Sequence, residues 1–251
     1  MSEFSIQQLV DDIAQSLLPE QYDRAVERSH AAFDALNEQI IAETGVKLDC
    51  RAGCAVCCSL RVEVFAHEIF RLARHIRRHF SEDEFAALLD RLAAHAEQVR
   101  PLTVFEHATQ NIICPLLQDG RCSVYAARPQ SCRRHHSQDL AACVFTFDHP
   151  DDLEFPGAHD RDLFRALTGA MQENIDVYAG FGFDHTIYEL GTALAEALHD
   201  PASWERWQAT SRPFSAPRSH RRRDMRLVKP PERFKINASV VGGWKRSGAE
   251  R

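Results

Sequence analysis

Thiol side chains are the groups in this sequence best suited to chemistry, and all of them lie between positions 50 and 143. They form two groups separated by a long segment without cysteine. The groups are Cys50, Cys54, Cys57 and Cys58, followed by Cys114, Cys122, Cys132 and Cys143. Thiolate sulfur is a soft ligand, and four thiolates commonly hold one zinc ion or one iron–sulfur cluster. The pattern therefore predicts a soft-metal centre, with all eight cysteines as candidate ligands.

The first group is compact enough to act as a unit. Cys50, Cys54 and Cys57 are spaced so that one turn of backbone can bring three sulfurs to the same centre, and Gly53 helps the chain turn tightly. Adjacent side chains tend to diverge, so Cys58 either serves a second centre or packs as an apolar residue. The eight thiols suit two four-sulfur centres, or one centre with spare reactive cysteines.

Basic residues accompany the second group. Arg128 and Arg133 are candidate cofactor-binding residues, because a guanidinium group offsets thiolate charge or binds an anionic ligand beside the centre. Arg134 is placed to do the same. His135 and His136 follow directly and are alternative metal ligands.

Composition limits the class of protein. With 251 residues, 44% of them apolar, 26% charged, and a net charge of −6, the chain can bury a full core and shows no general case for nucleic-acid binding. Its first residues lack the pattern of a secretory signal, and no apolar stretch is long enough to span a membrane. We therefore expect a cytoplasmic protein, in which thiols stay reduced unless a metal holds them. A disulfide framework is the weaker alternative.

Hydrophobic periodicity predicts a mostly α fold: a helical domain in which two cysteine-rich loops form the metal site. Helices are expected over residues 4–18, 19–45, 66–80, 82–99, 161–178 and 186–198. The helices over 66–80 and 82–99 are expected to form an antiparallel hairpin, and Ser81 with Glu84 fits a capping box at their junction. Asp119–Gly120 marks a turn between Cys114 and Cys122.

The composition changes near the end of the chain. We expect a helical domain over residues 1–210, with the metal-binding region at about 45–145, and a basic, extended or disordered tail over 211–251. Such a tail suits contact with RNA, an acidic partner or an anionic membrane. It has few aromatic residues among its basic ones, so nucleic-acid contact is the weak alternative and a solvated tail the stronger prediction.

At the cysteines, the chain resembles the YkgJ-type cysteine-cluster family of zinc- or iron-chelating CxxCxxCC proteins. The matching segments are Cys50–Cys58, Cys114–Leu117, Gly120–Tyr125 and Arg128–Arg133. The resemblance covers roughly residues 45–145 and implies a metal-bearing helical domain. A relative, flagellin lysine N-methylase, looks like an iron–sulfur methyl-transfer enzyme, so the resemblance leaves room for catalysis without fixing a reaction.

One rival pattern shares the same cysteines. The spacing of Cys50, Cys54 and Cys57 also occurs in radical S-adenosylmethionine enzymes, which resemble one another in a β/α barrel. Alternating strand and helix patterns are absent here, which argues against that fold.

The sequence predicts a metal-binding protein that holds an iron–sulfur cluster, [4Fe–4S] being one form, or zinc. Its role would be redox chemistry or group transfer, with a protein as one conceivable substrate. The alternatives are a zinc-stapled interaction module without catalysis, and a protein for metal storage or delivery.

Overall fold

The computed structural model describes residues 19–51, 53–155 and 157–215, and within them the predicted mostly α fold is confirmed. The helices are α2 (Pro19–Thr44), α3 (Ala66–His79), α4 (Glu82–Val99), α5 (Val104–Ala108), α6 (Gln130–Arg134), α7 (Leu140–Asp148), α8 (Arg161–Gly180), α9 (Leu190–His199) and α10 (Ala202–Gln208). Two short 3₁₀ helices are η1 (Val56–Ser59) and η2 (Tyr125–Ala127). The helix expected over residues 4–18 lies outside the described residues.

Two small antiparallel sheets connect distant parts of the chain. Strand β1 (Glu63–Val64) pairs with β4 (Tyr188–Glu189), so that Glu63 lies opposite Glu189. Strand β2 (Leu117–Gln118) pairs with β3 (Arg121–Cys122). The expected turn between them is present at Asp119 and Gly120, whose φ angles are 50° and 72°. Positive φ at both central residues is typical of a tight hairpin turn.

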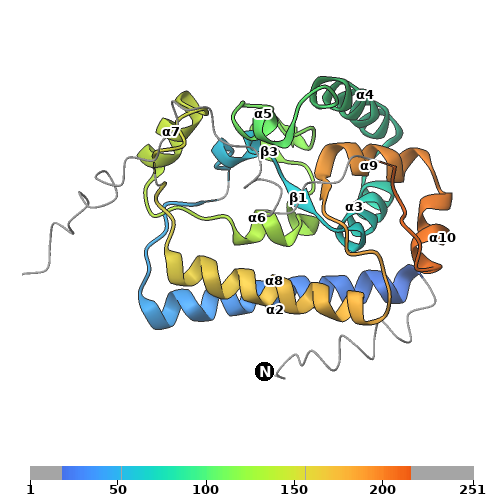
Figure 1. The fold of residues 1–251 in the computed structure, drawn as a ribbon, viewed down its shortest axis with the longest axis horizontal. Coiled ribbons are helices and arrows are strands. Elements are labelled where there is room, and N and C mark those ends of the chain that lie inside the picture. The colour runs from blue at the N-terminus through green and yellow to red at the C-terminus, as the bar shows by residue number, and fades with distance from the viewer. Residues whose placement is uncertain (1–18, 52, 156, 216–251) are drawn as a thin grey trace, which may run out of the picture.

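The helices lie in two groups, with α6 between them (Figure 1). Helices α2 and α8 pack side by side along one edge of the molecule. On the other side, α9 packs against both α3 and α4. The sequence predicts that α3 and α4 form a hairpin, and their principal partner is instead α9, whose Ala193 and Leu194 are fully buried.

Local sequence explains where these helices begin. At the α3–α4 junction, the amide of Glu84 donates to Ser81 Oγ at 3.3 Å and the amide of Ser81 donates to Glu84 Oε2 at 2.8 Å. This is the expected capping box. Helix α9 begins at Leu190, later than the expected residue 186, because Tyr188 and Glu189 pair with β1. Hydrophobic periodicity does not report such pairing.

An aromatic cluster closes the end of the domain near α10. Trp207 packs against the rings of Tyr22 from α2 and Phe70 from α3, with centroid distances of 5.2 and 5.6 Å. Phe214 contacts Phe70 and is almost fully buried. The described chain therefore remains packed on the domain through the first residues of the segment expected as a basic tail. The rest of that segment lies outside the described residues.

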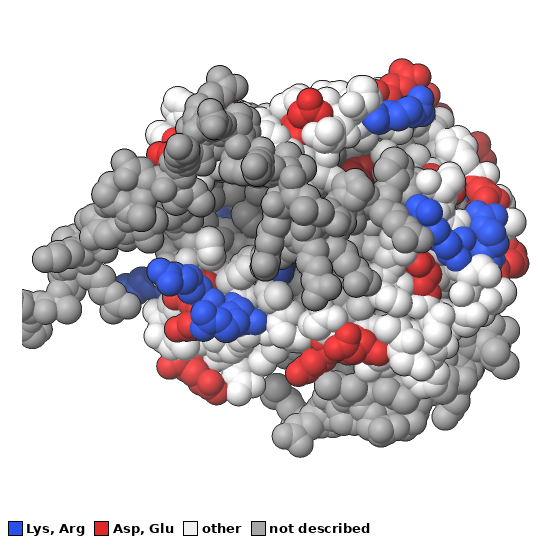
Figure 2. Space-filling model, viewed as in Figure 1, with Lys and Arg blue, Asp and Glu red and all other residues white. Residues whose placement is uncertain are grey.

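The visible surface of the described residues carries mixed charge. On the face in Figure 2, Lys and Arg side chains lie next to Asp and Glu side chains rather than in a field of one sign. Within the described part of the chain, no helix is long and apolar enough to cross a membrane.

A glycine permits the close approach of α9 to α4. A Cβ atom at Gly191 would lie 2.3 Å from Cδ2 of His95, which is far inside van der Waals contact. We expect Gly191→Ala to lower the free energy of unfolding by about 1–3 kcal/mol, because a buried ring must move. Gly169→Ala, inside α8 and with open space at its Cβ position, is the matched control. Urea unfolding should show no loss for this control, since alanine favours helix. Equal stability of the two variants would contradict the steric explanation.

Candidate metal centre

The first cysteine group lies on a loop that turns twice before β1. Gly53 has a φ of +85°, a left-handed conformation that favours glycine. The amide of Cys54 donates to the carbonyl of Arg51 at 3.0 Å, and the amide of Cys58 donates to the carbonyl of Ala55 at 3.0 Å. These turns lead into η1, which carries Cys57 and Cys58. Short-range backbone hydrogen bonds thus hold the first group together.

The second group meets the first across the fold. The amide of Cys114 donates to the carbonyl of Cys58 at 2.7 Å, and the amide of Ser137 donates to Cys50 Sγ at 3.2 Å. Helix α7, which carries Cys143, also packs against η1. All eight cysteines are free thiols. The two stretches, distant in sequence, therefore converge on one region without disulfides.

Four thiols from both stretches form what we call the inner group: Cys57, Cys114, Cys122 and Cys132. Burial raises the pKa of Cys132 well above its ordinary value, and the nearby thiols of Cys114, Cys57 and Cys122 raise it further. Burial likewise raises the pKa of Cys114 to about 12. The raised pKa values favour neutral thiols in the absence of a cation, and a bound metal ion would stabilise the thiolate form instead.

A second set of thiols, which we call the outer group, includes the exposed Cys50. It contains Cys50, Cys54, Cys57 and Cys143. Burial raises the pKa of Cys50, the amide of Ser137 opposes this shift, and the other thiols of the group raise it again. Cys57 is common to both groups. A hydrogen bond with the Cys58 side chain, together with burial, raises the pKa of Cys57 above its ordinary value. Adjacent Cys57 and Cys58 therefore lie where the two groups meet.

The two candidate arginines have different surroundings. Arg128 stacks on Tyr125, with 4.1 Å between its guanidinium carbon and the ring centroid, and its charge acts to lower the pKa of Cys57 and Cys122. The Arg133 guanidinium is buried against Asp34 and donates to the carbonyls of Ala126 and Arg128 at 2.7 and 2.8 Å. Arg128 thus offers charge to the thiols, whereas Arg133 ties α6 to α2.

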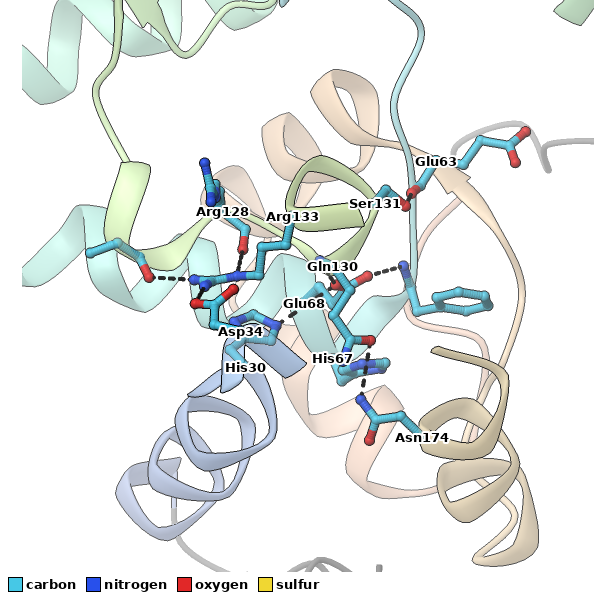
Figure 3. A network of polar contacts seen from close by, with 12 residues as sticks. His30, Asp34, Glu63, His67, Glu68, Arg128, Gln130, Ser131, Arg133 and Asn174 are labelled. Atoms are coloured by element: carbon cyan, nitrogen blue, oxygen red, sulfur yellow. Dashed lines mark hydrogen bonds and ion pairs between the residues drawn. The ribbon is translucent and has the colours of Figure 1, made fainter. Parts of the chain in front are cut away.

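A buried carboxylate fixes the helix that carries Cys132 (Figure 3). Glu68 of α3 accepts a hydrogen bond from the amide of Gln130 at 2.6 Å, and its Oε1 lies 3.8 Å from Nε2 of His30 in α2. Asn174 of α8 donates to the Gln130 side chain at 3.2 Å, and Ser131 donates to the carbonyl of Glu63. Four elements therefore position α6. Nothing in the spacing of these residues indicates the network.

A small cavity of about 150 Å³ adjoins the outer group. Cys57 and Cys143 line it, together with His135, His136 and His159. Both ring nitrogens of His136 are engaged, one with the carbonyl of Arg134 at 2.9 Å and the other with the amide of Asp160 at 3.2 Å. These bonds leave it no free nitrogen for a metal, although the sequence makes it a candidate ligand.

Sulfur spacing distinguishes the cysteine region from a closed single-ion site. A close trio of metal-binding side chains has one ligand atom from each residue within 4.8 Å of the other two. Among the described residues, His95, His107 and Glu189 form such a trio, whereas no three cysteines do. Around one zinc ion, Zn–S bonds of about 2.3 Å bring the sulfurs closer together than this limit. Cys57 and Cys58 are nevertheless close enough for a side-chain hydrogen bond.

Comparison with known proteins agrees with the geometry. No curated protein and no solved structure matches the chain. A family model does match: residues 49–149 fit CxxCxxCC, described as "Putative zinc- or iron-chelating domain". This match begins just before Cys50 and ends after Cys143, so it contains every cysteine and confirms the resemblance expected from the sequence. Residues 49–149 are thus similar to the zinc- or iron-chelating domain of the cysteine-cluster family.

Proposed function

We propose that this chain is an iron–sulfur protein with two adjacent four-thiolate centres, which acts in redox or group-transfer chemistry on a protein side chain. The observation that supports it is the meeting of two sets of thiols at Cys57 and Cys58. One centre would use Cys114, Cys122 and Cys132, and the other Cys50, Cys54 and Cys143. Cys57 and Cys58 would each complete one centre.

Iron–sulfur clusters and single zinc ions place their thiolates at different separations. Thiolates around an iron–sulfur cluster are held apart by the iron and sulfide atoms between them, whereas thiolates of a zinc ion crowd together. No cysteine trio in the described structure has the crowded arrangement. Zinc is the second candidate, because the matched family description includes it.

The donor set suits a cationic centre. Thiolate is the ligand form of cysteine, and each thiolate adds a negative charge to a partly buried site. Arg128 supplies one compensating positive charge beside Cys57 and Cys122. A bound metal ion would compensate the remaining negative charge. We place the protein in the cytoplasm, where reducing conditions keep its cysteines as free thiols that can bind the metal.

The cavity suggests the size of the substrate group. A bound cluster supplies electron transfer or an open iron site for group transfer. The cavity of about 150 Å³ is smaller than typical small-molecule pockets of about 300–1,000 Å³. Val144, Phe145 and Phe147 of α7 are exposed apolar residues beside it. A single side chain of a protein substrate fits these features better than a free cofactor-sized molecule.

Anaerobic purification with iron and sulfide analysis tests the proposal. We expect a brown protein that carries iron and acid-labile sulfide in equal amounts, at about eight atoms of each per chain for two [4Fe–4S] centres. Half that content would indicate one centre with spare cysteines. A colourless protein with stoichiometric zinc and no sulfide would overturn the proposal and favour the zinc-stapled module.

A further inference from the structure

Three residues outside the two thiol groups form a further cluster of metal-binding side chains, and the charge of one of them, Glu189, acts on the nearby thiol of Cys114. His95 comes from α4, His107 from α5, and Glu189 from the start of α9. All three are buried, and one ligand atom of each lies within 4.8 Å of the others. His95 Nε2 is 3.0 Å from Glu189 Oε1. The fold therefore brings two imidazoles and a carboxylate together from segments that are remote in sequence.

Backbone contacts hold the three side chains in position. Glu189 accepts hydrogen bonds from the amides of Gly191 at 2.9 Å and Thr192 at 2.8 Å, which cap α9. Gly191 leaves room for the His95 ring, which occupies the space that a Cβ atom would need. The amide of His107 donates to the carbonyl of Thr103 at 3.0 Å. Preorganised ligands of this kind lower the cost of ordering a metal site.

One polar atom of the cluster lacks a protein partner. His95 is 7% exposed, and its Nδ1 atom is buried without a hydrogen bond in the described part of the chain. An unsatisfied buried group of this kind costs about 1–3 kcal/mol. The contact with Glu189 uses the other ring nitrogen, Nε2, so an ion bound there would leave Nδ1 as it is, and the support for a metal site is the second histidine beside the His95–Glu189 pair.

The geometry points to a second metal site, in which His95, His107 and Glu189 bind a divalent ion of the zinc class. Two imidazole nitrogens and one carboxylate oxygen are a known ligand set for zinc and for ferrous iron, with coordination positions left open. Tetrahedral ligands at about 2.0–2.1 Å from zinc lie roughly 3.3 Å apart. The three ligand atoms, which lie within 4.8 Å of one another, would have to move closer together to bind the ion.

A cavity gives an ion access to the cluster. Its volume is about 450 Å³, and both His107 and Glu189 line it. His199 lines the same cavity without belonging to the cluster. No cysteine is among the lining residues. The site is therefore chemically distinct from the thiol groups and does not depend on the function proposed for them.

Zinc analysis of the full-length protein tests this site. The protein is equilibrated with excess Zn²⁺, desalted, and analysed for zinc and iron per chain. We expect the wild type to retain about one zinc more than His107→Ala and Glu189→Gln, in keeping with a single-ion site. The glutamine introduced by Glu189→Gln keeps a side-chain oxygen that can still cap α9. The matched control His199→Ala should retain the wild-type zinc content.

Three outcomes would overturn the inference. The first is equal zinc content in the wild type and in folded His107→Ala and Glu189→Gln proteins, with folding checked by circular dichroism. The second is an equal loss in His199→Ala. The third applies if both cluster variants unfold: a ¹¹³Cd-loaded wild type whose spectrum contains thiolate signals alone. Zinc and iron are measured separately. The difference in zinc content between the wild type and the cluster variants therefore tests this site even if the cysteines bind no iron–sulfur cluster.

Discussion

Replacing Cys132 with serine should remove about half of the iron and sulfide from the anaerobically purified protein, since one of two four-thiolate centres loses a ligand. Burial and the neighbouring thiols of Cys114, Cys57 and Cys122 together raise the pKa of Cys132, which places it among the other thiols of the inner group. Serine keeps the shape of the side chain but offers a hard oxygen instead of a soft sulfur. Metal and sulfide analysis, with the visible spectrum, measures the loss.

Two further variants separate ligation from misfolding. Cys143→Ser should remove the other half of the iron, because Cys143 belongs to the outer group near Cys50. Gln118→Ala, on the exposed hairpin beside Cys122, is the control and should keep full metal content. A Cys132→Ser protein that is folded and retains all of its iron would exclude Cys132 as a ligand. Equal, complete loss in both cysteine variants would favour one shared centre.

Replacing Glu68 with alanine should lower the free energy of unfolding by several kcal/mol, because two buried amides lose their acceptor and each such loss costs about 1–3 kcal/mol. Glu68 is 1% exposed and accepts hydrogen bonds from the amides of Phe65 at 3.2 Å and Gln130 at 2.6 Å. The variant leaves both amides and the His30 ring without their partner. Urea unfolding measures the loss, and Glu43→Ala on exposed α2 should cost less than about 1 kcal/mol.

Acid tests the charge of Glu68 separately from its hydrogen bonds. Burial alone would raise its pKa, but the His30 and His67 rings and the Gln130 amide hold that pKa below the ordinary value. The charge therefore stabilises the fold above the unfolded-state pKa of about 4.3, and this contribution is lost as pH falls through the folded-state pKa. The stability difference between wild type and Glu68→Gln should narrow on acidification. If the difference in the free energy of unfolding between the two proteins did not change with pH, the charge of Glu68 would not contribute to stability.

The sequence predicts the parts of this fold that depend on local patterns. Periodic apolar residues locate α3, α4 and α8, and Ser81 with Glu84 marks a helix start because capping is a contact over three residues. The cysteine spacing likewise indicates a soft-metal region, and the family match confirms that resemblance. Ligation by the individual cysteines stays a prediction.

Contacts between remote residues could not be predicted in this way. Glu68 meets Gln130 across 62 positions, and His95 meets Glu189 across 94. Each pair depends on how helices pack, and neither has a characteristic spacing. Arg133 shows the same limit: its contacts with Asp34 and Ala126 have no characteristic spacing, and cofactor binding by this residue stays a prediction.

The register of the short β1–β4 pair affects the geometry of both proposed metal sites. The carbonyl of Glu63 accepts a hydrogen bond from the hydroxyl of Ser131, which is next to Cys132 in the sequence. In the sheet, Glu63 lies opposite Glu189. A slip of one residue in this pairing would turn Glu189 to the opposite side of its strand, away from His95. The same slip would shift β1 relative to α6. Any redesign of either proposed metal site must therefore preserve the pairing of Glu63 with Glu189.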